Sequence, residues 1–244
     1  MTAFTFDRRT LSRLAQVTVV VLLWMYDKQL AVALAGLFHV RLPELPLIPL
    51  SYLTLVLAGS IIWWMKSRKE PLSGIGLIPP KRWLLYFGQG FLLFVVSISF
   101  DIFVHPIINP IIQSITGADP HLAERHFAAV KGNLGLFLYL LPFAWLIGGF
   151  GEEVINRGFV MTRIAQILGE GRAAWIAAAL LQSIPFALGH GYQGPVGMID
   201  VYLSGVISGF GVLIFRRNLW PAMIAHGLQD SLGFFALYLG IVHA

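Results

Sequence analysis

The sequence predicts an all-α protein, a polytopic transmembrane helix bundle of about seven spans that forms a single domain over residues 1–244. Of these 244 residues, 57% are hydrophobic and 12% are charged, which is about half the charged fraction of a soluble domain. The mean hydropathy is +0.76. Apolar runs close to the ~20 residues that cross a bilayer recur along the chain. The strand alternation of an outer-membrane barrel is absent from the sequence.

The apolar runs are separated by short polar or proline-rich stretches. Asp27-Lys28 interrupts the first run and could instead mark its outer end at Tyr26, and a proline-rich turn at 39–46 follows it. Residues 105–133 read as a long mixed connection whose amphipathic part, 121–131, is suited to the membrane interface. The predicted spans cover residues 14–38, 47–65, 83–104, 134 into a central polar stretch, 173–190, 196–215 and 219–242.

Lysine and arginine positions predict the orientation of these spans. Twelve basic residues fall on one side of the predicted membrane and three on the other, which places the N-terminus in the cytoplasm. The net charge of +5 is spread over short loops, so the expected partner is the lipid bilayer and not nucleic acid. We therefore expect an integral membrane protein of the bacterial cytoplasmic membrane. The chain has no cysteine, which excludes disulfides and thiol chemistry.

Two adjacent carboxylates and an arginine lie inside an otherwise apolar stretch at Glu152, Glu153 and Arg157. Each charge at membrane depth costs at least ~2.5–3.5 kcal/mol, so a functional site is the default interpretation. Glu153 and Arg157 are spaced i,i+4 and can pair on one helix face. Glu152 is turned ~100° away, above Asn156, and is the candidate general base. The alternative is a structural ion-pair cluster that seals a helix junction.

Two further polar islands interrupt later apolar runs. One runs from Phe186 to His190 and the other from His226 to Asp230. His226 and Asp230 are also spaced i,i+4, and a carboxylate one turn away can hold an imidazole in one orientation. A single histidine in a membrane helix is more often a packing residue, but two histidines with the acidic residues indicate a shared site.

In order, these motifs read Glu152-Glu153-xxx-Arg157, Phe186-xxx-His190 and His226-xxx-Asp230, and they resemble those of the type II CAAX prenyl protease and bacteriocin-processing (CPBP, or Abi) family. The resemblance covers about residues 140–235, within a predicted catalytic core of about 134–242. It implies a glutamate-type intramembrane endopeptidase that needs no cofactor and no metal. The implied substrate is a membrane-associated peptide or protein, with or without a lipid.

The resemblance also implies roles for the individual side chains. Glu152 together with His190 would activate a water molecule, and His226 with position 230 would stabilise the oxyanion. Asp230 departs from the asparagine of the prenyl-protease branch, because an ionised aspartate cannot donate a hydrogen bond to an oxyanion. Either Asp230 is protonated or it orients His226. The supporting residues would be Glu153, Arg157, Phe186 and Asn156.

Straight helices would not bring these residues to one depth. A straight fourth span would place Glu152 near the inner face, whereas His190 would lie ~26 Å along the fifth span, near the outer face. Two features of the sequence could bring them to the same depth. The glycines at 148–151 could break the fourth span, and Pro185 could kink the fifth.

Four other functions fit parts of the pattern. His190, His226, Glu152 and Asp230 could form a zinc set, although a His-Glu-x-x-His motif is absent from the sequence. A serine protease would need a reactive serine with a histidine base, and a transporter could use the buried charges as a proton path. A catalytically silent scaffold or bacteriocin-immunity protein would bind partner membrane proteins through the same motifs. The candidate serines are Ser204, Ser208 and Ser231.

Overall fold

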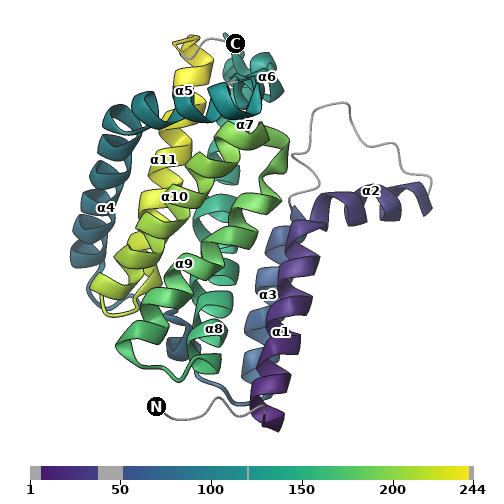
Figure 1. The fold of residues 1–244 in the computed structure, drawn as a ribbon, viewed down its shortest axis with the longest axis vertical. Helices are drawn as coiled ribbons and strands as arrows, with labels where there is room; N and C mark the ends of the chain where they lie inside the picture. Colours follow the sequence, from purple (N-terminus) through teal and green to yellow (C-terminus); the bar gives the residue numbers. More distant parts are fainter. Residues whose placement is uncertain (1–6, 38–51, 120, 242–244) are drawn as a thin grey trace.

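The computed structural model describes residues 7–37, 52–119 and 121–241. Every regular element in these ranges is helical (Figure 1), which confirms the all-α prediction. The α-helices are α1 (Arg8–Met25), α2 (Asp27–Leu37), α3 (Tyr52–Ser67), α4 (Trp83–Phe103), α5 (His105–Thr116), α6 (Leu122–His126), α7 (Leu134–Phe143), α8 (Met161–Ile167), α9 (Arg172–Gly189), α10 (Gly194–Ile214) and α11 (Leu219–Leu239). Short 3₁₀ turns are η1 (Leu72–Ile75), η2 (Ala128–Val130) and η5 (Gly191–Gln193), and π-helical segments are η3 (Ala144–Glu152) and η4 (Val154–Val160).

Within the described residues, four helical stretches are long and apolar enough to cross a membrane. They are Trp83–Phe103, Leu134–Ile167, Arg172–Gly189 and Gly191–Ile214. The count of seven spans and the cytoplasmic N-terminus stay predictions. Three predicted boundaries lie outside the described residues: the end of the first span at 38, the start of the second at 47 and the end of the last at 242. The predicted turn at 39–46 lies outside them as well.

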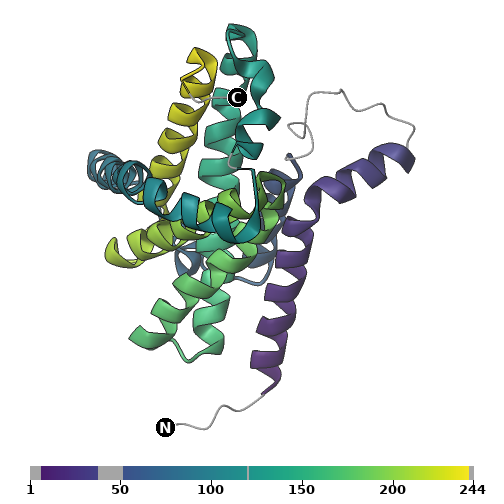
Figure 2. The same ribbon diagram turned by 45° about the horizontal axis from the view of Figure 1, so that its top comes forward.

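The polar pair in the first apolar run marks the end of a helix. α1 ends at Met25 and α2 begins at Asp27, and Figure 1 shows α2 turned away from the axis of α1. Asp27 is buried, and its Oδ2 accepts a 2.9 Å hydrogen bond from Thr54 Oγ1 on α3. A carboxylate in the first turn also suits the positive end of a helix dipole. Figures 1 and 2 show α1 and α2 as two helices at an angle to one another. One helix running unbroken through Asp27 is therefore wrong, and the first helix ends next to Tyr26, as the alternative has it. That this helix is a membrane span stays a prediction.

The predicted mixed connection at 105–133 is more regular than expected. α5 begins at His105, directly after α4, although it contains Pro106 and Pro110. Pro106 lies in the first turn, where its missing N–H would have no helical partner in any case. α6 and η2 follow as short helices. In Figure 1, α5 lies across one end of the bundle.

The glycine-rich stretch does not break the fourth span, so this prediction is wrong. Residues Leu134–Ile167 form one continuous helical stretch of 34 residues, which passes through the π-helical segments η3 and η4. The wider π-turn bonds i to i+5 and is frequent at functional sites. Glycine is needed here for close packing. A Cβ added at Gly149 would lie 2.8 Å from the Met223 carbonyl oxygen of α11.

The length of this central helix explains how Glu152 and His190 come to lie at the same depth. The central helix continues for another ~15 residues beyond Glu152, or ~22 Å, before the chain turns. α9 has 18 residues and runs ~27 Å in the opposite direction. His190, which directly follows α9, therefore lies at about the depth of Glu152. The expectation that the fourth span ends near Glu152 failed because hydropathy does not reveal how far a helix continues past a charged patch.

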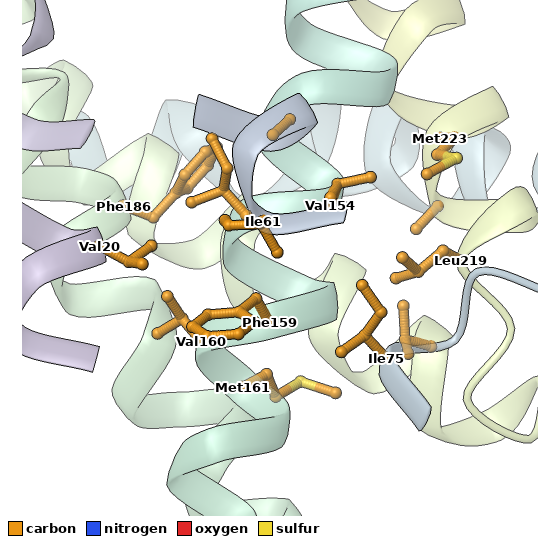
Figure 3. Close-up of a cluster of buried hydrophobic side chains, with 14 of the residues drawn as sticks. Val20, Ile61, Ile75, Val154, Phe159, Val160, Met161, Phe186, Leu219 and Met223 are labelled. Atoms are coloured by element: carbon orange, nitrogen blue, oxygen red, sulfur yellow. The ribbon is translucent and has the colours of Figure 1, made fainter. Parts of the chain in front are cut away.

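Buried apolar side chains surround the lower half of this central helix. Phe159, Val154 and Met161 belong to it, and Figure 3 shows them packed among side chains of neighbouring elements, including Ile61 of α3 and Leu219 of α11. In a bilayer the lipid tails are as apolar as these side chains, so this core stabilises the bundle through close van der Waals packing. The core fixes the helix that carries Glu152 and Glu153 against α3, α9 and α11.

Candidate active site

The four predicted catalytic side chains border one cavity. Glu152 comes from η3, His190 from the end of α9, and His226 and Asp230 from α11. The cavity has a volume of about 240 Å³. A smaller cavity of about 150 Å³ lies beside it and is also bordered by His190, His226 and Asp230. The structure therefore brings together residues that the sequence places on three different helical stretches.

Glu153 is the most buried charge of the site, with no exposed side-chain surface. Its Oε1 lies 3.1 Å from Arg157 Nη1, as the i,i+4 spacing predicted, and its Oε2 accepts a 3.2 Å hydrogen bond from Ser208 Oγ. Glu153 Oε1 also lies 2.9 Å from His226 Nδ1. A buried carboxylate needs such a set of donors, and here they tie together η3, η4, α10 and α11.

The contact with Glu153 orients the ring of His226. Because a carboxylate accepts, Nδ1 carries the proton and donates it, which leaves Nε2 facing the cavity. Nε2 lies 3.9 Å from Glu152 Oε2 and 3.7 Å from Asp230 Oδ2. Both distances exceed a direct hydrogen bond. Glu153 is therefore the carboxylate that contacts His226 at hydrogen-bond distance, and the role of Asp230 stays a prediction.

Glu152 borders the same cavity as His190, although straight helices would have placed the two at opposite faces of the membrane. Its carboxylate borders the cavity near His226, with 15% of the side chain exposed. Asn156, one turn later, is buried and donates a 3.0 Å hydrogen bond from Nδ2 to the Glu152 backbone carbonyl. In the wider π-turn this side-chain donor supports the backbone that presents Glu152.

Phe186 links both histidines. Its ring centroid lies 4.9 Å from that of His190 and 6.3 Å from that of His226, and the Arg157 guanidinium lies over it at 3.9 Å. His190 Nδ1 is 2.8 Å from the Phe186 carbonyl oxygen. Since a carbonyl only accepts, Nδ1 donates, and in the neutral ring Nε2 carries the lone pair.

The absence of a side chain at Gly148 leaves room for the Asp230 carboxylate. A Cβ at Gly148 would collide with Asp230 Oδ2 and would lie 3.3 Å from His226 Nε2. The backbone of η3 is thus packed directly against the carboxylate of α11. This close approach explains why a glycine is needed at 148 without any break in the helix.

Sequence reasoning missed several residues of the site. Trp24, Asp27 and Thr54 border the larger cavity from the N-terminal helices, and Trp24 stacks on Phe186 with centroids 5.5 Å apart. Ser208 was considered only as a packing residue or a nucleophile, and it is instead a hydrogen-bond donor to Glu153. The interruption of an apolar run by Asp27 was the one available signal.

A second polar network lies next to the site on α4, α5, α10 and α11. Gln229, which borders both cavities, donates a 3.0 Å hydrogen bond to Asp101 Oδ2. His105 lies 3.6 Å from Asp101 and 3.3 Å from Asp200. This network holds four helices together at the end of the bundle covered by α5.

Among the described residues, no group of three or more His, Asp or Glu side chains is arranged to hold a metal ion. Residues 134–232 match the family model of the Rce1-like type II CAAX prenyl endopeptidases. Comparisons with curated proteins and with solved structures found no match. The apolar helices and the family match together support an integral membrane protein.

Proposed function

We propose, on the premise that residues 134–232 belong to the CAAX protease family of the Rce1-like type, that this protein is an intramembrane endopeptidase of the glutamate type. The observation that supports this most is the common cavity bordered by Glu152, His190, His226 and Asp230. Its volume of about 240 Å³ accommodates several water molecules, each with a share of ~30 Å³ in the liquid. The expected substrate is a peptide or protein that reaches the cavity from the bilayer.

In the proposed reaction, Glu152 takes a proton from a cavity water while His190 Nε2 helps to position it. The water oxygen then bonds to the peptide carbonyl carbon, and Glu152 returns the proton to the leaving amine when the C–N bond breaks. This assignment is supported by the cavity itself, because Glu152 and His190 both border it and it has room for water.

His226 is the proposed oxyanion partner. Its Nδ1 is held by Glu153 at 2.9 Å, so a protonated ring donates from Nε2 toward the cavity, where charge develops. Arg157 and Ser208 keep Glu153 in place for this task. Glu153 is thus a positioning residue that acts through His226.

The decisive experiment uses the purified full-length protein in proteoliposomes with a library of membrane-anchored peptides. Glu152→Gln and His190→Ala should each lower cleavage at least ~10²-fold while insertion and melting temperature stay unchanged, since general acid–base catalysis contributes about 10²–10⁴-fold. Glu170→Gln, an exposed glutamate in the turn before α9, is the matched control. Full cleavage by purified Glu152→Gln would exclude the mechanism.

Two further measurements, one with a metal chelator and one in cells, separate the competing functions. We expect cleavage to survive a metal chelator, and loss of activity that zinc restores would instead favour a metalloprotease. A cellular phenotype that is unchanged by Glu152→Gln would point to the scaffold or immunity role.

Asp230 has its own test within the same assay. Asp230→Asn replaces an acceptor by a side chain that can donate to an oxyanion, and we expect this variant to keep cleavage within about tenfold of the unmodified protein. Loss of cleavage comparable to that of Glu152→Gln would mean that the Asp230 carboxylate itself takes part in the chemistry.

A further inference from the structure

A basic pocket lies far from the cavity, where the start of α1, the end of α3 and α8 meet. Five arginines border it, together with a single acidic side chain, Glu70. Its volume is about 490 Å³. In Figure 1 the start of α1 and the end of α3 lie together at the bottom of the molecule, away from the end covered by α5. The arginines are Arg8, Arg9, Arg13, Arg68 and Arg163.

Internal contacts hold part of this pocket in place. Arg163 is buried, pairs with Glu70, and donates a 2.9 Å hydrogen bond to Gln166 Oε1. Its guanidinium also lies 4.9 Å from the ring centroid of Phe159. Arg13 donates a 3.1 Å hydrogen bond to the Gln166 backbone carbonyl. The Arg163 Nε is buried without a hydrogen-bond partner.

The charges of this pocket are unbalanced. Glu70 pairs with Arg163, and Asp7 lies close enough to Arg9 to attract it. The five arginines that converge here still outnumber these two carboxylates within the described part of the chain. Arg8 and Arg9 are exposed on the first turn of α1. Clustered arginines of this kind attract an anion, and their planar guanidinium groups match the oxygens of a phosphate.

An apolar groove continues from the basic pocket along α1 and α3. The two share Ser12, Gln16 and Arg68, and the groove has a volume of about 450 Å³. From Ser12 to Val20 it follows α1 over ~12 Å. Its apolar lining includes Ala15, Val19, Val20, Leu57, Ile61 and Phe159.

We propose that the basic pocket and the apolar groove form one binding site for an anionic glycerophospholipid. The phosphate lies among the arginines, and an acyl chain lies in the groove between α1 and α3. Charge complementarity argues for this occupant, because a zwitterionic lipid brings its own cation, whereas a soluble anion would leave the adjoining groove unused. Arg8, Arg9 and Arg13 are among the basic residues that predict a cytoplasmic position for the start of α1. Anionic lipids at the cytoplasmic surface attract such basic residues.

The test measures lipids retained by the purified full-length protein in native mass spectrometry after exchange into mixed micelles. The probes are phosphatidylglycerol and phosphatidylcholine with the same acyl chains. We expect at least tenfold stronger retention of phosphatidylglycerol. Arg163→Gln alone could fail to fold, so the main variant is Arg8→Gln/Arg9→Gln, which should lower that retention about tenfold or more. Lys81→Gln/Arg82→Gln removes two exposed charges outside the pocket and should leave retention unchanged.

A second pair of variants tests the groove. Ala15→Phe fills the groove and should lower phosphatidylglycerol retention about fivefold, whereas Thr18→Phe, on α1 but outside the groove lining, should not. Equal retention of both lipids, or unchanged retention in Arg8→Gln/Arg9→Gln, would overturn the proposal. Full displacement of the lipid by millimolar inorganic phosphate would overturn it as well, because the acyl chain would then contribute nothing.

Discussion

The N-terminal helices and the segment 134–232 build the same cavity in different ways. The segment supplies the proposed catalytic side chains, including Glu152 and His226, from motifs that are visible in the sequence. α1, α2 and α3 lie outside the family match, yet they add Trp24, Asp27 and Thr54 to the cavity wall. The motifs therefore mark the proposed catalytic side chains, and part of the cavity wall comes from helices that carry no motif.

The largest effect on stability should come from the buried ion pair of the motif segment. Arg157→Met leaves Glu153 charged and buried, and removing one partner of such a pair costs about 3–5 kcal/mol. Folded yield and melting temperature in detergent should fall sharply. Arg172→Met, at an exposed arginine at the start of α9, should leave both nearly unchanged. A fully stable Arg157→Met protein would contradict the structural role of the pair.

A smaller loss should follow from closing the space between η3 and α11. Gly148→Ala places a methyl group against Asp230, and overpacking of this kind typically costs about 1–3 kcal/mol. Peptide cleavage should fall together with stability, because Asp230 and His226 must shift. Gly59→Ala on α3 has open space around the new methyl group and is the control in thermal unfolding.

The contribution of the N-terminal helices can be tested at Thr54. Thr54→Val removes the hydroxyl that donates to buried Asp27, and a hydrogen bond to a charged group contributes about 1.5–3 kcal/mol. Thr54→Ser keeps the hydroxyl and should recover most of the loss in thermal unfolding. If Thr54→Val is as stable as the unmodified protein, the N-terminal wall is not held by this contact.

The smallest effect should come from the second polar network. Asp101→Asn retains an oxygen that can accept from Gln229, so stability should change by less than about 1 kcal/mol. We expect peptide cleavage to change by less than threefold. A loss as large as that of Glu152→Gln would mean that this network belongs to the chemistry of the site.

Local sequence patterns were enough for the helical fold class and for the Glu153–Arg157 pair. Both depend on short-range rules: apolar runs of membrane length, and side chains one helical turn apart. The same rules failed where a proline-containing stretch formed α5 and where clustered glycines continued as a π-helix. Packing against neighbouring helices overrides local preference at those places.

The amino-acid order also identified Glu152, His190, His226 and Asp230 as belonging together, because charged and imidazole groups are costly in lipid and need a shared polar environment. Their depth, the role of Glu153 in orienting His226, and the entry of Asp27 into the cavity wall followed only from the folded chain. These features depend on contacts between residues far apart in the chain, such as Glu153 with His226 and Trp24 with His190, and spacing along one helix carries no information about them.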